Sequence, residues 1–412
     1  MQKIIIIVIC LSVFCCFNSK SSNLIDSIII EGALNRTDLY LDKIQKKNVG
    51  LVVNNNSFIK NSHLVDTLLK KNINIVSIFS PEHGFKGDYE AGQKIENNYY
   101  NDIPIYSLYG KSKKPSNFSL NNLDVIVFDL QDVGVRFYTY ISTLHYMMEA
   151  CAENNISLIV LDRYNPHMNS IDGPVLNKEL SSFVGMHPVP VIYGMTIGEY
   201  SLMINGEGWL KDSLYCDLVV IPLSQKQISI NNYFFNSIDN FILKRPPSPN
   251  LKTTKSIKLY PTLCFFEGTT ISIGRGTDTP FELIGASFLK PEDFLEFSYL
   301  EKSIINFYPK SRLESLNPKF VNEECVGTNC QFYHNNDIIG KIDISIIIDF
   351  YNLCSHKNIS FFNSFFRKLS GNLDLEKKIS QGWTVSEVKD SWMKELILFK
   401  DIRQRYLMYS RD

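Results

Sequence analysis

The sequence predicts an α/β protein: a mostly parallel sheet with helices on both faces, followed by a smaller α+β domain. Between Asn48 and Ile221, short apolar runs alternate with segments of helical period. These runs are apolar throughout, which is typical of parallel strands covered on both faces. The alternation fades after the segment RPPSPN at 245–250, whose prolines break any helix and stiffen the chain. We therefore expect an N-terminal domain over 24–247 and a C-terminal domain over 252–412.

In the N-terminal domain, the apolar runs predict strands at 49–53, 73–79, 103–108, 125–128, 157–161, 189–193 and 218–221. Helical spacing predicts helices at 62–71, 139–153 and 196–205. Ser62 is a suitable helix cap, and Thr196 with Glu199 three residues later has the pattern of a capping box. These strands and helices alternate, as a parallel sheet requires.

The C-terminal domain has a less regular pattern. We expect strands at 259–266, 271–273 and 342–348, and helices at 291–299, 361–369, 373–381 and 384–406. This order of elements fits a small α+β arrangement.

Size and charge are those of an ordinary globular protein. The chain has 412 residues, 44% of them hydrophobic, which is enough for about two or three domains. Its net charge is −1, so the chain as a whole has no charge that would attract nucleic acid or an anionic membrane.

The N-terminus has the pattern of an export signal. One lysine precedes the apolar run IIIIVICLSVFCCF, and polar residues follow. The run is shorter than the about 20 apolar residues of a membrane-spanning helix. We expect a signal peptide over 1–20 and an exported protein, either periplasmic or held at the membrane by a lipid on Cys15 or Cys16. In an exported protein, Cys325 and Cys330 could also form a disulfide.

Charged and phenolic side chains follow the predicted strand at 125–128. Asp129 comes first, then Asp132, Arg136 and Tyr138. Ligands of open parallel sheets bind outside the carboxyl ends of the strands, so this loop is a candidate binding site. Asp132 lies further into the loop than Asp129 and is the better candidate to face a ligand. Arg136 could bind a substrate carboxylate, or it could neutralise the aspartates in a structural ion pair.

The ends of the next two predicted strands carry further polar residues. Arg163 and Asn165 follow the strand at 157–161 and could bind hydroxyls or a carboxylate; a salt-bridged loop is the alternative. Tyr193 ends the strand at 189–193 and is free to face a ligand.

The segment Ser80-Pro81-Glu82-His83-Gly84 holds a carboxylate on stiff backbone at the end of another strand. Proline fixes the exit from the strand and glycine allows a tight turn. Glu82 in such a place suits an acid, a base or a nucleophile, or else it is a glutamate that caps the loop. In the C-terminal domain, Glu267 and Arg275 occupy polar turns that could reach over the first domain's sheet edge, or could simply be ordered turns.

Long segments of the chain resemble the bacterial exo-β-N-acetylmuramidases, a family first described as a domain of unknown function. The segments that carry the resemblance are SPEHGFKG (80–87), PIYSLYG (104–110), DVIVFDLQDVGVRFYTYISTLHYMMEACAEN (124–154), VLDRYNP (160–166), DGPVL (172–176), SFVGMHPVPVIYGMTIGEYSLMINGEGWL (182–210), PPSPNL (246–251) and LYPTLCFFEGTTISIGRGTDTPFELIGA (259–286). The resemblance implies a Rossmann-like N-terminal domain, a cleft between two domains, and removal of non-reducing terminal N-acetylmuramic acid from peptidoglycan fragments. It also implies that Glu82 is catalytic.

The residues are compatible with that chemistry. Glycoside hydrolysis usually needs two carboxyl groups. We expect Glu82 to be one and Asp132 the other, with Glu267 or a tyrosine as rivals for the second role. N-acetylmuramic acid carries a lactyl carboxylate, so an arginine is expected in the pocket. The residues expected to bind substrate are His83, Asp129, Arg136, Tyr138, Arg163, Asn165, Tyr193, Glu267 and Arg275.

No metal or cofactor is expected. The histidines are not at metal-ligand spacing, and the sequence has no P-loop, nucleophile elbow or glycine-rich dinucleotide fingerprint. Two other functions are open: a surface or periplasmic receptor that captures cell-wall sugars without cleaving them, and a sugar deacetylase. A deacetylase would normally use a metal held by histidines.

Overall fold

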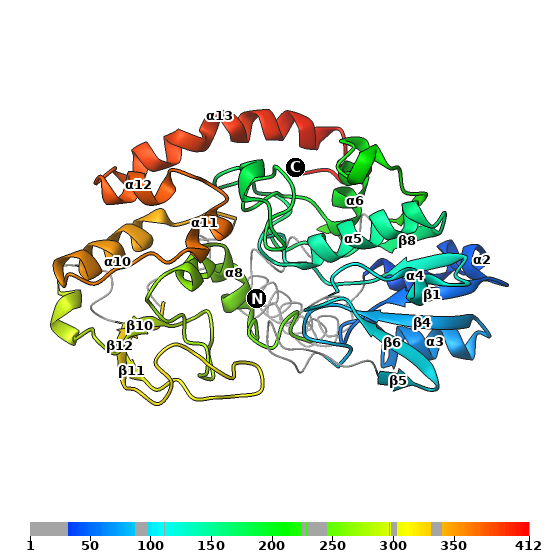
Figure 1. Ribbon diagram of the computed structural model, residues 1–412, viewed down its shortest axis with the longest axis horizontal. Coiled ribbons are helices and arrows are strands. Elements are labelled where there is room, and N and C mark those ends of the chain that lie inside the picture. Colours follow the sequence, from blue (N-terminus) through cyan, green and yellow to red (C-terminus); the bar gives the residue numbers. More distant parts are fainter. Residues whose placement is uncertain are drawn as a thin grey trace, which may run out of the picture.

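The computed structural model describes residues 32–86, 98–110, 112–224, 228–229, 245–295, 297, 303–330 and 340–411. The expected signal peptide and the candidate lipid sites Cys15 and Cys16 lie outside these residues. Figure 1 shows the N-terminal sheet and its helices beside a C-terminal part built mainly from helices, with the helix α13 running along both. No helix within the described ranges is long and apolar enough to cross a membrane.

The N-terminal part is built on a seven-stranded sheet in the order β5-β6-β4-β1-β7-β8-β9. The neighbours pair in parallel except β5 with β6. The strands are β1 (Asn48–Val52), β4 (Asn74–Ser80), β5 (Asn98–Tyr100), β6 (Ile103–Ser107), β7 (Val125–Phe128), β8 (Ser157–Leu161) and β9 (Leu218–Ile221). A small hairpin joins β2 (Phe58–Ile59) and β3 (Ser62–His63). The predicted fold class, a mostly parallel sheet with a smaller second domain, is confirmed.

Each face of the sheet has its own core, because side chains alternate along a strand. On β7, Val125 and Val127 point into one core, and Ile126 and Phe128 into the other. The first core includes residues of α2 (Leu41–Ile44) and α3 (Leu64–Lys70), and the second includes residues of α4 (Asn117–Leu120), α5 (Tyr140–Glu153) and α6 (Ile197–Gly206). Strands buried on both faces explain why the sequence shows continuous apolar runs.

One predicted strand of the N-terminal part has no counterpart in the sheet. The segment 189–193 is buried, yet within the described parts of the chain it makes isolated bridges only, from Ile192 to Val135 and to Asp172. The chain then turns at Gly194, whose φ is +64°, and enters α6. As predicted, Thr196 and Glu199 form the capping box of α6.

The C-terminal part differs more from its prediction. Its strands are β10 (Ile284–Ala286), β11 (Ile304–Phe307) and β12 (Cys325–Thr328), in the antiparallel order β10-β12-β11. Its helices are α8 (Thr254–Leu263), α10 (Ile344–His356), α11 (Phe365–Ser370), α12 (Leu375–Ser380) and α13 (Val385–Gln404), with shorter 3-10 turns at η5 (Cys264–Gly268) and η6 (Pro291–Phe294). Cys325 and Cys330 are both free, so the disulfide considered above is absent.

Two segments predicted as strands, 259–266 and 342–348, are helical. Thr253 and Ser256 form a capping box that starts α8, and Asp343 caps α10 by accepting from the backbone N–H of Ser345. The apolar run at 259–263 resembles a strand in sequence because this stretch of α8 is buried on all sides, so it lacks the polar face of a surface helix. Periodicity alone cannot distinguish such a helix from a buried strand.

The end of the chain returns to the N-terminal part, where Figure 1 places the C-terminus near α6. Arg403 donates to the carbonyl oxygen of Gly194 at 2.8 and 2.6 Å. Tyr409 packs in the core that contains β1 and donates its hydroxyl to Asp162 at 2.6 Å. Residues 403–411 therefore join α13 to the seven-stranded sheet of the N-terminal part.

Candidate active site

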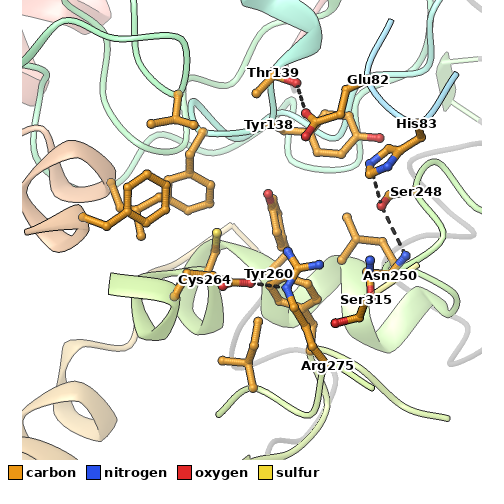
Figure 2. Close-up of a pocket in the computed structure, with 18 of the residues that line it drawn as sticks. Glu82, His83, Tyr138, Thr139, Ser248, Asn250, Tyr260, Cys264, Arg275 and Ser315 are labelled. Carbon is orange, nitrogen blue, oxygen red and sulfur yellow. Dashed lines mark hydrogen bonds and ion pairs between the residues drawn. The ribbon is translucent and has the colours of Figure 1, made fainter. Parts of the chain in front are cut away.

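A pocket of about 430 Å³ lies between the two parts of the chain. Its lining includes residues of the loops after β4, β6 and β7, the segment 183–184, the proline-rich segment, α8, the turns that follow it, the segment 315–319 and α11. Figure 2 shows Glu82, Tyr138 and Thr139 on one side of the hollow, and Tyr260, Cys264 and Arg275 on the opposite side. Small-molecule sites usually measure roughly 300–1,000 Å³, so this pocket is of a suitable size.

Glu82 is held by a tight turn after β4. The N–H of Gly84 donates to the carbonyl of Pro81 at 3.0 Å, and both His83 and Gly84 have positive φ, +71° and +77°. A left-handed backbone costs a residue with a side chain about 1–2 kcal/mol, so the surrounding contacts must hold His83 in place. Glu82 is 9% exposed as a residue and lines the pocket.

Thr139 orients the Glu82 carboxylate. Its hydroxyl donates to Glu82 Oε2 at 2.5 Å (Figure 2). Thr139 is the N-cap residue of α5, but its side chain makes no bond to its own helix. Its backbone is itself helical, at φ −74° and ψ −2°, which differs from the extended backbone of a capping residue and leaves the hydroxyl for the carboxylate.

The proline-rich segment forms one end of the pocket. Ser248 is within hydrogen-bond distance of His83 Nε2, at 3.1 Å, and accepts from the backbone N–H of Asn250 at 3.2 Å. Tyr138 donates its hydroxyl to the carbonyl of Pro247 at 2.6 Å. The segment that marks a change of pattern in the sequence is thus fixed to the residues around Glu82.

The opposite wall carries Glu267 and Arg275, which form an ion pair. Arg275 also lies over the ring of Phe281, 5.1 Å from its centroid. Burial lowers the pKa of Arg275, but the charge of the Glu267 carboxylate and its hydrogen bond together outweigh burial, so the pKa lies above its usual value. Among the described residues that line the pocket, Glu82 and Glu267 are the carboxylates.

Asp129, Arg163 and Asn165 do not line the pocket. Arg163 binds Asp129 with two parallel bonds, Nε to Oδ1 at 2.7 Å and Nη2 to Oδ2 at 2.6 Å, and both side chains are buried. Asn165 donates to the carbonyl of Met195 at 2.7 Å. These side chains hold neighbouring loops together at the sheet edge, which is the structural alternative to the predicted binding role.

Asp132 and Tyr193 also lie away from the pocket lining. Tyr193 donates its hydroxyl to Asp132 Oδ2, which also accepts the N–H of Gly134 at 2.7 Å. Burial raises the pKa of Asp132 to about 6, against the effect of these donors. Asp132 Oδ1 has no partner among the described residues. Asp132 thus does not line the pocket that Glu82 borders, and its assignment as the second catalytic carboxylate stays a prediction.

Arg136 is fully buried, and its hydrogen bonds to the described part of the chain go to backbone carbonyls. Its Nη1 donates to Pro174 and Val189 at 2.8 and 2.7 Å. Its Nη2 donates to Leu369 and Ser370, in α11, at 3.0 and 2.7 Å. The guanidinium that was expected to bind a substrate carboxylate instead connects the two parts of the chain.

Comparison with known proteins identifies the family. Residues 49–255 match the model of the N-terminal domain of the exo-beta-N-acetylmuramidase NamZ, and residues 258–409 match that of its C-terminal domain. The chain belongs to the NamZ family. It is 38% identical over 385 residues to the peptidoglycan beta-N-acetylmuramidase NamZ of Bacillus subtilis, covering 90% of this chain and 89% of that protein. The family resemblance seen in the sequence is confirmed.

Two solved structures of DUF1343 family proteins from Bacteroides fragilis share this fold. One is 36% identical, with a TM-score of 0.78 and coverage of 92% of this chain and 99% of that one. The other is 28% identical, with a TM-score of 0.77 and coverage of 93% and 100%. The two-part architecture described above is therefore that of known members of this fold.

In this NamZ family chain, several pocket residues escaped the sequence analysis. Thr139 was predicted as the start of a helix, and Ser248 and Asn250 as part of a domain boundary; all three lie in segments that resemble the family, but no binding role was predicted for them. Lys319 follows no recognisable motif. The position of Thr139, one residue after Tyr138 in a segment already noted, was the one available signal. Ser248 and Lys319 reach the pocket through tertiary packing alone.

Proposed function

We propose that this peptidoglycan glycosidase of the NamZ family releases N-acetylmuramic acid from the non-reducing end of cell-wall fragments, with Glu82 as a catalytic carboxylate. The observation that carries the proposal is the position of Glu82. Its carboxylate is fixed by the turn after β4, oriented by the Thr139 hydroxyl, and borders a pocket of monosaccharide scale. Catalysis by a carboxyl group requires this kind of fixed placement next to the bond that is cleaved.

The opposite wall supplies groups for an anionic sugar. N-acetylmuramic acid carries a carboxylate on its lactyl ether, and arginine binds carboxylates with paired hydrogen bonds. Arg275 is the arginine on the described pocket lining, and it takes the role that the sequence analysis also considered for Arg136. Glu267 faces the same pocket and is the candidate for the second carboxyl group that glycoside hydrolysis usually needs.

The place of action proposed is outside the cytoplasm. The apolar run after Lys3 has the features of an export signal, and Cys15 or Cys16 could carry a lipid. In that compartment the enzyme would serve turnover and recycling of the cell wall. Fractionation of cells that express the full chain, with a Cys15→Ser, Cys16→Ser double variant as control, tests this. Recovery of the wild type in the cytoplasm with an intact N-terminus would contradict the proposal.

Glu82→Gln tests the catalytic role. The variant keeps the size of the side chain and an acceptor for the Thr139 hydroxyl, so it should fold normally. We expect hydrolysis of a chromogenic N-acetylmuramic acid glycoside to fall by at least 10²-fold, the lower end for loss of an acid–base group. Glu179→Gln, at an exposed site on the 3-10 turn Lys178–Leu180, is the matched control and should keep the wild-type rate.

Three results, from kinetics, substrate binding and product analysis, would contradict parts of the proposal. A folded Glu82→Gln variant with a near wild-type rate would exclude Glu82 as the catalyst. Wild-type protein that binds the muramic acid disaccharide without cleaving it would favour the receptor function. Proton NMR of the released sugar gives the anomer formed first, and a product other than N-acetylmuramic acid would refute the proposed substrate.

A further inference from the structure

Lys319 inserts its ammonium group into a cage of backbone carbonyls at the wall of the pocket. Its Nζ donates to the carbonyl oxygens of Phe266, Thr269 and Ile271 at 2.8, 2.7 and 2.9 Å, and lies 3.4 Å from that of Glu267. An ammonium has three N–H donors, so the three short contacts use all of them. Bonds from a charged donor are about twice as strong as bonds between neutral groups.

The four carbonyls belong to the backbone that carries the Glu267–Arg275 wall. They run from the end of η5, which contains Glu267, through the turn that leads to Ser272 and Arg275. Four carbonyl dipoles directed at one point repel each other unless a cation lies between them. The path of this backbone therefore depends on a positive charge that comes from a segment about 50 residues away, as the separations of 48 to 53 residues show.

Lys319 also decides the net charge of this wall. The ion pair between Arg275 and Glu267 is neutral overall. Burial lowers the pKa of Lys319 to about 8, with Glu267 and Cys264 acting against this shift and Arg275 adding to it. At pH 7 the amine therefore still carries its proton. The wall thus has one positive charge more than its carboxylate neutralises.

We propose that Lys319 is a positioning residue for substrate binding: its ammonium fixes the backbone of 266–271 so that Glu267 and Arg275 face the pocket, and it makes this wall cationic. The second part of the proposal rests on the proposed function, because a cationic wall favours a sugar that carries a carboxylate. Glu82 lies on the other wall, so Lys319 acts on the reaction only through the position of Glu267 and Arg275.

Lys319→Ala tests the proposal because it removes the ammonium and leaves a space the size of n-propylammonium. We expect the KM for a chromogenic N-acetylmuramic acid glycoside to rise at least tenfold, because the wall loses a positive charge and Arg275 loses its support. The kcat should fall as well, because the same backbone carries Glu267, the candidate second carboxyl group. Addition of n-propylammonium chloride should lower the KM of the variant at least threefold relative to the same concentration of sodium chloride. A residue needed only for folding would not give this recovery. An unchanged KM, or no recovery with the amine, would overturn the proposal.

Lys252→Ala is the matched control. Lys252 pairs with Glu314 in the same segment that carries Lys319, at 2.8 Å, but it does not reach the carbonyls of 266–271. The KM of the Lys252→Ala variant should equal that of the wild type, both with and without n-propylammonium chloride. A rise in KM equal to that of Lys319→Ala would show that any weakening of this segment has the same effect, and would overturn the specific role of Lys319.

Hydrogen–deuterium exchange separates this proposal from the proposed function. In Lys319→Ala, amides of 266–275 should exchange at least tenfold faster than in the wild type, while amides of 125–161 should keep their rates. If wild-type protein fails to hydrolyse the glycoside, the proposed function falls, and exchange alone then decides whether Lys319 fixes this backbone. Unchanged exchange at 266–275 would refute the positioning role.

Discussion

Replacing Arg136 with methionine removes a buried guanidinium that binds both parts of the chain. Its four hydrogen bonds, to the carbonyls of Pro174, Val189, Leu369 and Ser370, measure 2.7 to 3.0 Å. At about 1.5 kcal/mol for each bond to a charged group, they contribute roughly 6 kcal/mol. The apolar methionine side chain recovers about 2 kcal/mol by burial. We therefore expect the free energy of unfolding to fall by about 4 kcal/mol.

Chemical denaturation at pH 7, followed by tryptophan fluorescence, measures this loss. Trp209 is stacked on His187 in the N-terminal part, and Trp392 is buried in α13, so the signal reports on both parts of the chain. Arg405→Met is the matched control. Its side chain is 59% exposed in a salt bridge to Glu207, so its loss should be below about 1 kcal/mol.

Arg136→Lys provides a second, milder variant in case Arg136→Met does not fold. Lysine keeps the charge but has three donors on one atom, so it cannot reproduce two pairs of bonds that diverge from a planar group. We expect an intermediate loss of stability. The reasoning would be refuted by folded Arg136 variants that unfold at the wild-type denaturant concentration and show a tenfold higher KM. That result would return Arg136 to the substrate-binding role.

Two further substitutions test buried groups outside the pocket. Burial raises the pKa of Asp132 from 3.8 to about 6, so the folded protein holds this proton more tightly than the unfolded chain. The contribution of Asp132 to stability should therefore fall by up to about 3 kcal/mol as the pH rises from 4 to above 6, and Asp132→Asn should lack this pH-dependent contribution. Chemical denaturation of the wild type and the variant at pH 4.5 and pH 7.5 measures this contribution. Identical pH dependence of the unfolding free energy in both proteins would contradict the prediction. Loss of activity in a folded Asp132→Asn variant would restore Asp132 as a catalytic candidate. Tyr409→Phe removes a donor to Asp162 and an acceptor for the N–H of Leu223, and should lower the unfolding free energy by about 2 kcal/mol. Tyr215→Phe, at a 74% exposed site, should have no measurable effect in the same denaturation experiment; an equal effect of the two substitutions would argue against a role of residues 403–411 in joining α13 to the sheet.

The sequence predicted the parallel sheet because its signal is local. Strands such as β7 and β8 are buried on both faces, so their apolar runs are continuous and end where the chain leaves the sheet. The same local logic located Glu82, because the proline and glycine on either side of it favour a turn at the end of the strand. It failed at 259–266, where a helix buried on all sides has the same composition as a buried strand.

By itself, then, the sequence determined the fold class, the family and the position of Glu82 at the end of a strand. Only the tertiary structure decided which of the charged residues reach the pocket. Arg136 finds two of its carbonyl partners 233 and 234 residues further along the chain, and Lys319 binds carbonyls some 50 residues earlier. The physical reason is that the role of a charged side chain depends on the polar groups that tertiary packing places around it. The residues near it in sequence do not reveal which groups those are.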